Sequence, residues 1–157
     1  MRVGIGFDTH PLIPGRKLVL GGVEIPFHRG LSGWSDADAL LHAIIDALLG
    51  AAALGDIGQH FPPGDTGLNG ISSVELLKRT ASLLADSNWQ IVNIDATIVT
   101  EAPKLQDYEM DMRKNIGSAL NIKIEQVSVK AKTSAKMGFI GRGEGVASHA
   151  VVLIDSR

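Results

Sequence analysis

The segment 36–49 constrains the fold most, because it is apolar on almost every side once it is wound into a helix. Within it, Asp38, His42 and Asp46 are spaced four residues apart and so lie along one stripe. A helix that is apolar on its other sides is buried, and buried polar groups are costly unless they find partners. The stripe is therefore either a structural Asp–His hydrogen-bond pair or part of a ligand-binding site.

The composition predicts an aliphatic core with more apolar surface than one small domain usually buries. Apolar residues make up 45% of the 157 residues and glycines number 18, whereas aromatic residues make up only 4%. Two explanations stay open, a single dense core or an interface between subunits. In either case the length predicts one domain over residues 1–157.

The charge balance excludes several classes of partner. Lys and Arg number 15 against 17 Asp and Glu, the net charge is −2, and no long basic tract is present. We therefore expect binding to neither nucleic acid nor an anionic membrane. No apolar run is long enough to span a bilayer, and residues 1–4 lead directly into a strand-like pattern, so we expect a cytoplasmic protein. Cysteine is absent, so any zinc would be bound by histidine and carboxylate.

Periodicity and turn residues predict an α+β fold. Strands are expected over 2–7, 90–100, 126–131 and 146–154, with an extra hairpin over 17–25. Helices are expected over 36–49, with Asp36 as the N-cap, over 72–87, with Ser72 and Glu75 as a capping box, and from Pro103 to about residue 120. The prediction is a mixed four-stranded sheet with helices packed on one face.

Asp8 and His10 are the first pair of candidate metal ligands, at the end of the strand expected over 2–7. Residues two apart in extended chain project to the same side, so both could bind one ion. An Asp and a His at this spacing, taken alone, are more often exposed loop residues than metal ligands. With His42 there would be three ligands and an open fourth position, the arrangement of a catalytic zinc site. Asp46 is the acid expected to orient the other ring nitrogen of His42.

Two glycine-rich loops contain candidate ligand-binding residues. In the first, over 55–70, Asp56 and Asp65 would either bind ribose hydroxyls or organise turns. In the second, over 132–145, Lys132, Thr133 and Ser134 precede four glycines whose backbone N–H groups would make a phosphate cradle. Neither the Walker A pattern nor the G-x-G-x-x-G dinucleotide pattern is present, so phosphate binding is inferred only from the residues themselves.

A set of longer motifs runs along essentially the whole chain. They are Gly6-Phe7-Asp8-x-His10, 19–25 with Gly21-Gly22, Ser35-Asp36-x-Asp38, Leu41-His42-Ala43, the block 46–58, Phe61-Pro62, Ala102-Pro103-Lys104 and 138–145. With these motifs the chain resembles the 2-C-methyl-D-erythritol 2,4-cyclodiphosphate synthases of the non-mevalonate isoprenoid pathway. The block 46–58 is far more specific than any short motif.

The resemblance implies a reaction and its cofactors. The 2-phosphate of 4-diphosphocytidyl-2-C-methyl-D-erythritol 2-phosphate would attack the β-phosphorus of the diphosphate, close a cyclic diphosphate and expel CMP. Zn²⁺ on Asp8, His10 and His42 would act as Lewis acid, and Mg²⁺ or Mn²⁺ would accompany the diphosphate. The family is a homotrimer with its active sites between subunits, which implies the same for this chain.

The resemblance also implies residue roles. Thr133 and Trp34 would be catalytic, residues 100–106 would form the cytosine pocket, and Asp56 and Gly58 would hold sugar hydroxyls. The substrate-binding residues implied are Ser35, Asp56, Ile57, Gly58, Phe61, Asp65, Thr100, Ala102, Pro103, Lys104, Leu105, Gln106, Lys132, Ser134, Ala135, Phe139 and Arg142. Phe7, Phe139, Arg142 and Glu144 would lie near a central cavity of the trimer.

Three residues depart from the family pattern. Trp34 replaces a histidine, and an indole N–H can donate one hydrogen bond but carries no charge. Ala135 replaces a glutamate that binds the second metal, and Lys132 replaces a threonine. We hypothesise that the Lys132 ammonium takes over part of the neutralisation of the diphosphate.

Two other functions fit the same residues. A zinc-dependent nucleotide phosphodiesterase would use the three ligands with an activated water. A non-catalytic trimeric module that binds nucleotides or isoprenoid diphosphates would explain the departures at Trp34 and Ala135. The products formed from the cytidyl substrate distinguish all three.

Overall fold

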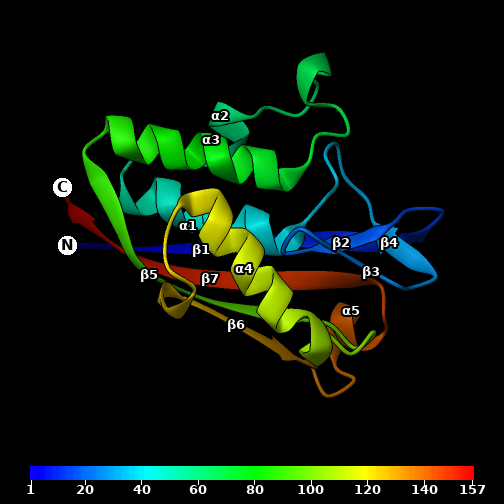
Figure 1. Cartoon of the computed structure of the whole chain (residues 1–157). Helices are drawn as coiled ribbons and strands as arrows, with labels where there is room; N and C mark the ends of the chain where they lie inside the picture. The colour runs from blue at the N-terminus through cyan, green and yellow to red at the C-terminus, as the bar shows by residue number, and fades with distance from the viewer.

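The computed structural model describes residues 1–157 and contains one mixed five-stranded sheet covered by helices on one face (Figure 1). The strand order is β4-β1-β7-β5-β6, in which only β5 and β6 are parallel. The strands are β1 (Arg2–Pro14), β4 (Arg29–Leu31), β5 (Trp89–Val99), β6 (Val127–Lys132) and β7 (Gly145–Ser156). The expected hairpin forms a separate pair, β2 (Leu18–Leu20) with β3 (Val23–Ile25).

The helices form two layers above the sheet, with α1 against β1 and β7 and α3 stacked on α1 (Figure 1). Beside them, α4 packs against α3 and β6. The helices are α1 (Ala39–Ala51), α2 (Ile57–His60), α3 (Ser73–Asp86), α4 (Glu109–Leu120) and α5 (Gly138–Gly141), with 3-10 turns at Thr66–Leu68, Gln106–Tyr108 and Ile124–Gln126. None of these helices has both the length and the apolar character needed to cross a bilayer.

Two glycines allow α1 to lie directly on the backbone of β1. A Cβ built on Gly4 would lie 1.9 Å from the carbonyl oxygen of Ala47, and one on Gly6 would lie 1.9 Å from that of Ala43. Any side chain at either glycine would force the two elements apart. The residue beside Ala43 is His42, and the next residue of β1 on the same face is Asp8. The close packing therefore brings these two side chains together.

The opposite face of the sheet is left open by the chain and carries exposed apolar side chains over β1 and β7. Val3, Ile5 and Phe7 of β1 are 68%, 74% and 50% exposed, and Val151 of β7 is 46% exposed. Ile5 pairs with Val151 in the sheet register, so these side chains form one continuous surface. The many apolar residues thus lie in two places, in a buried core beneath the helices and on this open face.

The α+β class is confirmed, and four details differ from the prediction. The sheet has a fifth strand, β4, which at three residues is too short to show alternation. β1 continues to Pro14, so Asp8 and His10 lie within the strand and not at its end. The N-cap of α1 is Asp38 in place of Asp36. The third long helix begins at Glu109, while Pro103 lies in the preceding loop after a cis peptide bond.

Candidate functional site

Asp8, His10 and His42 converge where β1 meets α1, and we call these three side chains the metal cluster. His10 Nε2 lies 2.8 Å and His42 Nδ1 lies 3.2 Å from the same oxygen, Asp8 Oδ2. The two nitrogens are 3.4 Å apart. Bonds of about 2.0 Å to a tetrahedral zinc ion place its ligand atoms about 3.3 Å apart. The three side chains, which are between 12% and 25% exposed, therefore fit a metal ion of that size and leave one side of it open.

The second ring nitrogen of each histidine has a partner that fixes the ring. His10 Nδ1 is 2.8 Å from the carbonyl oxygen of Ser32, so it donates there and leaves Nε2 free to bind a metal. His42 Nε2 is 2.9 Å from Ser73 Oγ, and the Ser73 hydroxyl in turn contacts Asp36. Such outer partners hold metal-binding histidines in one orientation.

Asp46 does not have the role expected for it. Its Oδ1 accepts a hydrogen bond of 2.8 Å from the N–H of Ile57, whereas the ring nitrogen of His42 that it was expected to orient contacts Ser73 and Ser35. The reason is geometric, because Asp46 lies one turn further along α1, next to the start of α2. Asp46 therefore positions α2.

The charges of the cluster are coupled. Burial raises the pKa of the Asp8 carboxyl, but hydrogen bonds and attraction from His10 and His42 outweigh burial and hold that pKa below its usual value. For His10, burial lowers the pKa, and the hydrogen bond and charge of Asp8 outweigh burial and raise the pKa above its usual value. Without a metal, the cluster thus favours a carboxylate paired with a protonated imidazole.

A cavity of about 210 Å³ lies beside the metal cluster. Its lining includes several residues expected to bind substrate, and the full set is Asp8, His10, Trp34, Ser35, His42, Ile57, Gly58, Phe61, Pro63, Leu68, Ile71 and Leu76. Asp56 caps the N-terminus of α2 by accepting a hydrogen bond from the N–H of Gln59, and so presents Ile57 and Gly58 to the cavity. The wall is mostly apolar and includes only a few polar groups, as is usual for small-molecule sites.

Trp34 forms part of this wall in a way that differs from its expected catalytic role. Its indole N–H donates a 3.0 Å hydrogen bond to the carbonyl oxygen of Asp65, and its own carbonyl accepts 2.9 Å from the N–H of Gly70. An indole has only one donor, so that donor binds the loop and not a substrate. The Asp65 carboxylate accepts from the N–H of Gly67 and organises the same loop.

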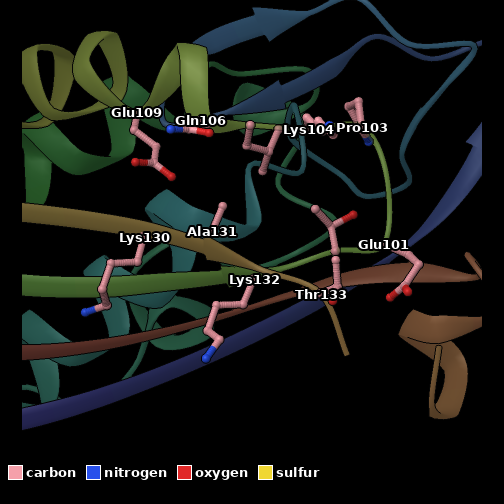
Figure 2. Close-up of a pocket in the computed structure, with 11 residues that line it drawn as sticks. Glu101, Pro103, Lys104, Gln106, Glu109, Lys130, Ala131, Lys132 and Thr133 are labelled. Atoms are coloured by element: carbon pink, nitrogen blue, oxygen red, sulfur yellow. The ribbon is translucent and has the colours of Figure 1, made fainter. Parts of the chain in front are cut away.

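A second cavity, of about 520 Å³, lies where β5 and β6 end (Figure 2). Its lining is Thr100, Glu101, Pro103, Lys104, Leu105, Gln106, Glu109, Lys130, Ala131, Lys132 and Thr133. Eight of the residues expected to contact the cytidyl substrate, including Thr133, are therefore brought together here. Ala102 does not line the cavity, but its carbonyl accepts the Thr100 hydroxyl at 2.8 Å and fixes the loop.

The two cavities lie on different strands of one sheet. Asp8 pairs with Ser148 of β7, Ser148 with Ile98 of β5, and Ile98 with Ala131 of β6. Three strand spacings separate the backbone of Asp8 from that of Ala131, which amounts to roughly 14 Å. The metal cluster and the second cavity are thus separate parts of this chain.

The turn after β6 holds the remaining predicted residues. Ala135 and Lys136 adopt left-handed backbone conformations, with φ of 54° and 62°. Ser134 and Ala135 lie on this turn and Phe139 and Arg142 on α5 or at its end, and none of the four lines either cavity. Arg142 instead forms an exposed ion pair of 2.8 Å with Glu144.

Two residues without an expected site role, Ser73 and Asp36, contribute to the metal cluster, and Glu101, which falls within the expected pocket residues 100–106, also has a contact that was not expected. Ser73 and Asp36 hold His42, and Glu101 lines the second cavity while binding the turn after β6. A signal existed for Ser73, which follows the capping serine of α3, and for Asp36, which belongs to the Ser35-Asp36-x-Asp38 motif. No local pattern marks Glu101, because its partners lie more than 30 residues away.

The sequence matches the model of the YgbB family over residues 1–155. It is 56% identical over 157 residues to the 2-C-methyl-D-erythritol 2,4-cyclodiphosphate synthase of Dehalococcoides mccartyi, covering 100% of both chains. It is 57% identical over 155 residues to the protein of the same name from Syntrophomonas wolfei, covering 99% of both.

Solved structures share the fold along nearly the whole chain. The bifunctional IspDF from Campylobacter jejuni superposes with a TM-score of 0.96 and 39% identity, over 99% of this chain and 42% of that one. The IspF structure from Plasmodium falciparum in complex with CDP superposes with a TM-score of 0.87 and 33% identity, over 99% of this chain and 96% of that one.

Proposed function

Since the chain belongs to the YgbB family, we propose that it carries out the reaction of the 2-C-methyl-D-erythritol 2,4-cyclodiphosphate synthases. It cyclises 4-diphosphocytidyl-2-C-methyl-D-erythritol 2-phosphate to the 2,4-cyclodiphosphate of the non-mevalonate isoprenoid pathway and releases CMP. The observation that carries this conclusion is full-length identity above 50% to proteins of that name, together with the convergent Asp8, His10 and His42.

Zn²⁺ is the metal that these three ligands suit best. Two imidazoles and one carboxylate with an open position are a donor set of catalytic zinc sites, and the chain contains no cysteine to offer an alternative. A bound zinc ion supplies Lewis-acid polarisation of a phosphoryl oxygen. The residues of the chain then fix the ion: His10 through Ser32, and His42 through Ser73 and Asp36.

The second cavity would bind the cytidine part of the substrate. The related Plasmodium falciparum structure holds CDP, and the cavity of this chain offers loop residues 100–106 for the base and Thr133 and Lys132 for the phosphates. The Thr133 hydroxyl would donate to a phosphate oxygen, and the Lys132 ammonium would neutralise charge beside Ala135, where no carboxylate is available for Mg²⁺ or Mn²⁺.

The two cavities would work together across a subunit boundary. The apolar face formed by Val3, Ile5, Phe7 and Val151 is the surface expected of an assembly. In a homotrimer that buries this face, the metal cluster of one copy would meet the nucleotide cavity of the next. The separation of the two cavities, with β7 between the strand of the metal cluster and the strands of the second cavity, supports this arrangement.

The chemistry requires positioning and no protein nucleophile. The attacking oxygen belongs to the 2-phosphate of the substrate, so the chain must hold it in line with the β-phosphorus and stabilise the developing charge. Asp56 and Gly58 would hold the sugar hydroxyls beside the metal cluster. The apolar wall with Phe61 and Leu68 would keep water from the phosphorus.

The test is CMP release from the cytidyl substrate by the zinc-loaded protein, with and without a chelator. Release of CMP with formation of the cyclic diphosphate, abolished by the chelator and restored by zinc, is expected. An acyclic phosphate product containing oxygen from water would instead indicate a nucleotide phosphodiesterase. Zinc and CDP binding without turnover would indicate a binding module.

A further inference from the structure

We propose that Glu101 is a positioning residue that shapes the turn 133–137, which carries Thr133, and thereby controls binding of the diphosphate but not of the base. The inference rests on the proposed function, since it assumes that phosphate groups bind beside Thr133. Glu101 does not contact the substrate. It acts through the turn.

The carboxylate of Glu101 binds the turn at two points. Its Oε2 accepts a hydrogen bond of 3.2 Å from the N–H of Ser134, and its Oε1 accepts one of 3.0 Å from the N–H of Lys136. None of the ion pairs in the chain involves Glu101. Its charge is therefore stabilised by backbone N–H groups, which form the kind of concavity that binds anions.

The turn needs this support because its backbone is strained. Ala135 and Lys136 are consecutive residues with left-handed φ angles, and neither is glycine. Such conformations persist in L-residues only where the surroundings hold them. The Ser134 hydroxyl adds a bond of 2.7 Å to the carbonyl of Met137 within the turn, but the only side chain from another segment that binds the turn's N–H groups is Glu101.

The other side of the turn rests against α5. A Cβ on Gly141 would lie 2.0 Å from the carbonyl carbon of Lys136, so the two backbones are in direct contact. The N–H of Gly141 also donates 3.0 Å to the carbonyl of Met137. The turn is thus clamped between Glu101 and α5, and removing Glu101 frees one side of it.

Glu101 lines the second cavity together with Thr133 (Figure 2), and its carboxylate binds the turn that follows Thr133. Residues 100–106, which are proposed to bind the base, are held by hydrogen bonds that do not involve Glu101. The N–H of Thr100 donates 2.9 Å to the carbonyl of Lys132, and the Thr100 hydroxyl donates 2.8 Å to that of Ala102. Loss of Glu101 should therefore leave the base wall in place and release the Thr133 hydroxyl.

The experiment compares cytidine with CDP as ligands of the zinc-loaded protein by isothermal titration calorimetry. In Glu101→Ala the Kd for CDP should rise about tenfold, as expected for the loss of hydrogen bonds to a charged group, while the Kd for cytidine stays within about twofold. Glu101→Gln keeps one acceptor oxygen and should lose about threefold in CDP affinity. Glu125→Gln removes an exposed charge outside both cavities and serves as the control.

An equal loss of cytidine and CDP affinity would overturn the inference, because it would show a general structural role. An unchanged CDP affinity in Glu101→Ala would overturn it as well. If Glu101→Ala does not fold, Glu101→Gln carries the same comparison. A different result would refute the proposed function, namely that the unmodified protein releases no CMP. A protein that turns over normally but shows no difference between ligands in the variants refutes only the role of Glu101.

Discussion

The metal cluster and the turn 133–137 are held in place in different ways. Asp8, His10 and His42 project from the middle of a strand and of a buried helix, and the backbones of these two elements touch at Gly4 and Gly6. The turn lies outside regular structure, has two left-handed residues and donates two backbone hydrogen bonds to the carboxylate of Glu101. One region is rigid through packing, the other through a few polar contacts.

This difference matches the tasks proposed for the two regions. A metal ion needs its ligands in place before it binds, and regular elements hold side chains more precisely than loops do. A substrate that enters and leaves needs a phosphate site that can adjust, and loops supply such sites. Changes in packing should therefore affect the metal cluster most, and changes in polar contacts should affect the turn most.

The largest effect is expected for the ligands themselves. His42→Ala removes one of the three proposed metal ligands. Because loss of even an outer partner of a ligand weakens binding by 10–100-fold, zinc affinity should fall by at least about 100-fold. CMP release should fall in parallel. Zinc content after dialysis and steady-state CMP release measure both. A variant that keeps zinc and activity would show that His42 is not a metal ligand.

Packing between α1 and β1 is tested by Gly6→Ala. The new methyl group would overlap the carbonyl oxygen of Ala43, so unfolding free energy should fall by about 3 kcal/mol, and zinc binding should weaken as α1 shifts. Gly50→Ala is the matched control, since it lies at the exposed end of the same helix with no atom nearby. The control should be neutral or more stable by up to about 1 kcal/mol.

The outer partner of His42 should matter less than the ligand itself. Ser73→Ala removes the hydroxyl that holds His42 Nε2 and leaves the three ligands intact. Zinc affinity should fall by about tenfold, measured by competition with a fluorescent chelator. Ser72→Ala, which removes only the cap of α3, is the control. Equal zinc affinities of the two variants would contradict this role of Ser73.

Acid should act on the metal cluster through His10. Its raised pKa means that protons compete with zinc already above pH 6.5, so zinc affinity should fall by up to about tenfold per pH unit below the pKa of His10. Stability of the metal-free protein responds in the opposite direction. The Asp8–His10 pair stabilises it fully between pH 3.8 and pH 6.5. This contribution is lost as the pH rises through the pKa of His10 or falls through the lowered pKa of Asp8.

The smallest effect is expected for Lys132. Lys132→Thr removes one exposed cation, so CMP release should fall by about threefold and should need more Mg²⁺ to reach its maximum. A Mg²⁺ titration of activity measures this. An unchanged rate and an unchanged metal dependence would refute the hypothesis that Lys132 neutralises the diphosphate.

The convergence of Asp8, His10 and His42 could be predicted because their spacing maps onto regular structure. Alternation along β1 places Asp8 and His10 on one face, and the apolar segment around His42 can only be a buried helix. The α+β class and most of the long elements followed from the same periodicities. The strand β4 escaped prediction because three residues carry no periodicity, and residues 103–108 were assigned to a helix because proline is common in a first turn.

The irregular regions were predicted less well because long-range hydrogen bonds decide them. Asp46 lies on the predicted stripe with His42, yet it binds Ile57, since the start of α2 folds back beside it. Trp34 was expected from the resemblance to be catalytic, whereas its N–H donates to the carbonyl oxygen of Asp65 across the loop. Neither partner can be deduced from spacing along the chain.

The most direct test of the account is complementation between two variants. His42→Ala damages the proposed metal side and Thr133→Ala the proposed phosphate side, so each variant alone should release CMP far more slowly than the unmodified protein. If the two cavities meet across subunits, coexpressed mixed trimers should contain intact sites and recover up to about a quarter of the unmodified activity. Mixed trimers no more active than either parent would show that the two cavities do not form one site between subunits.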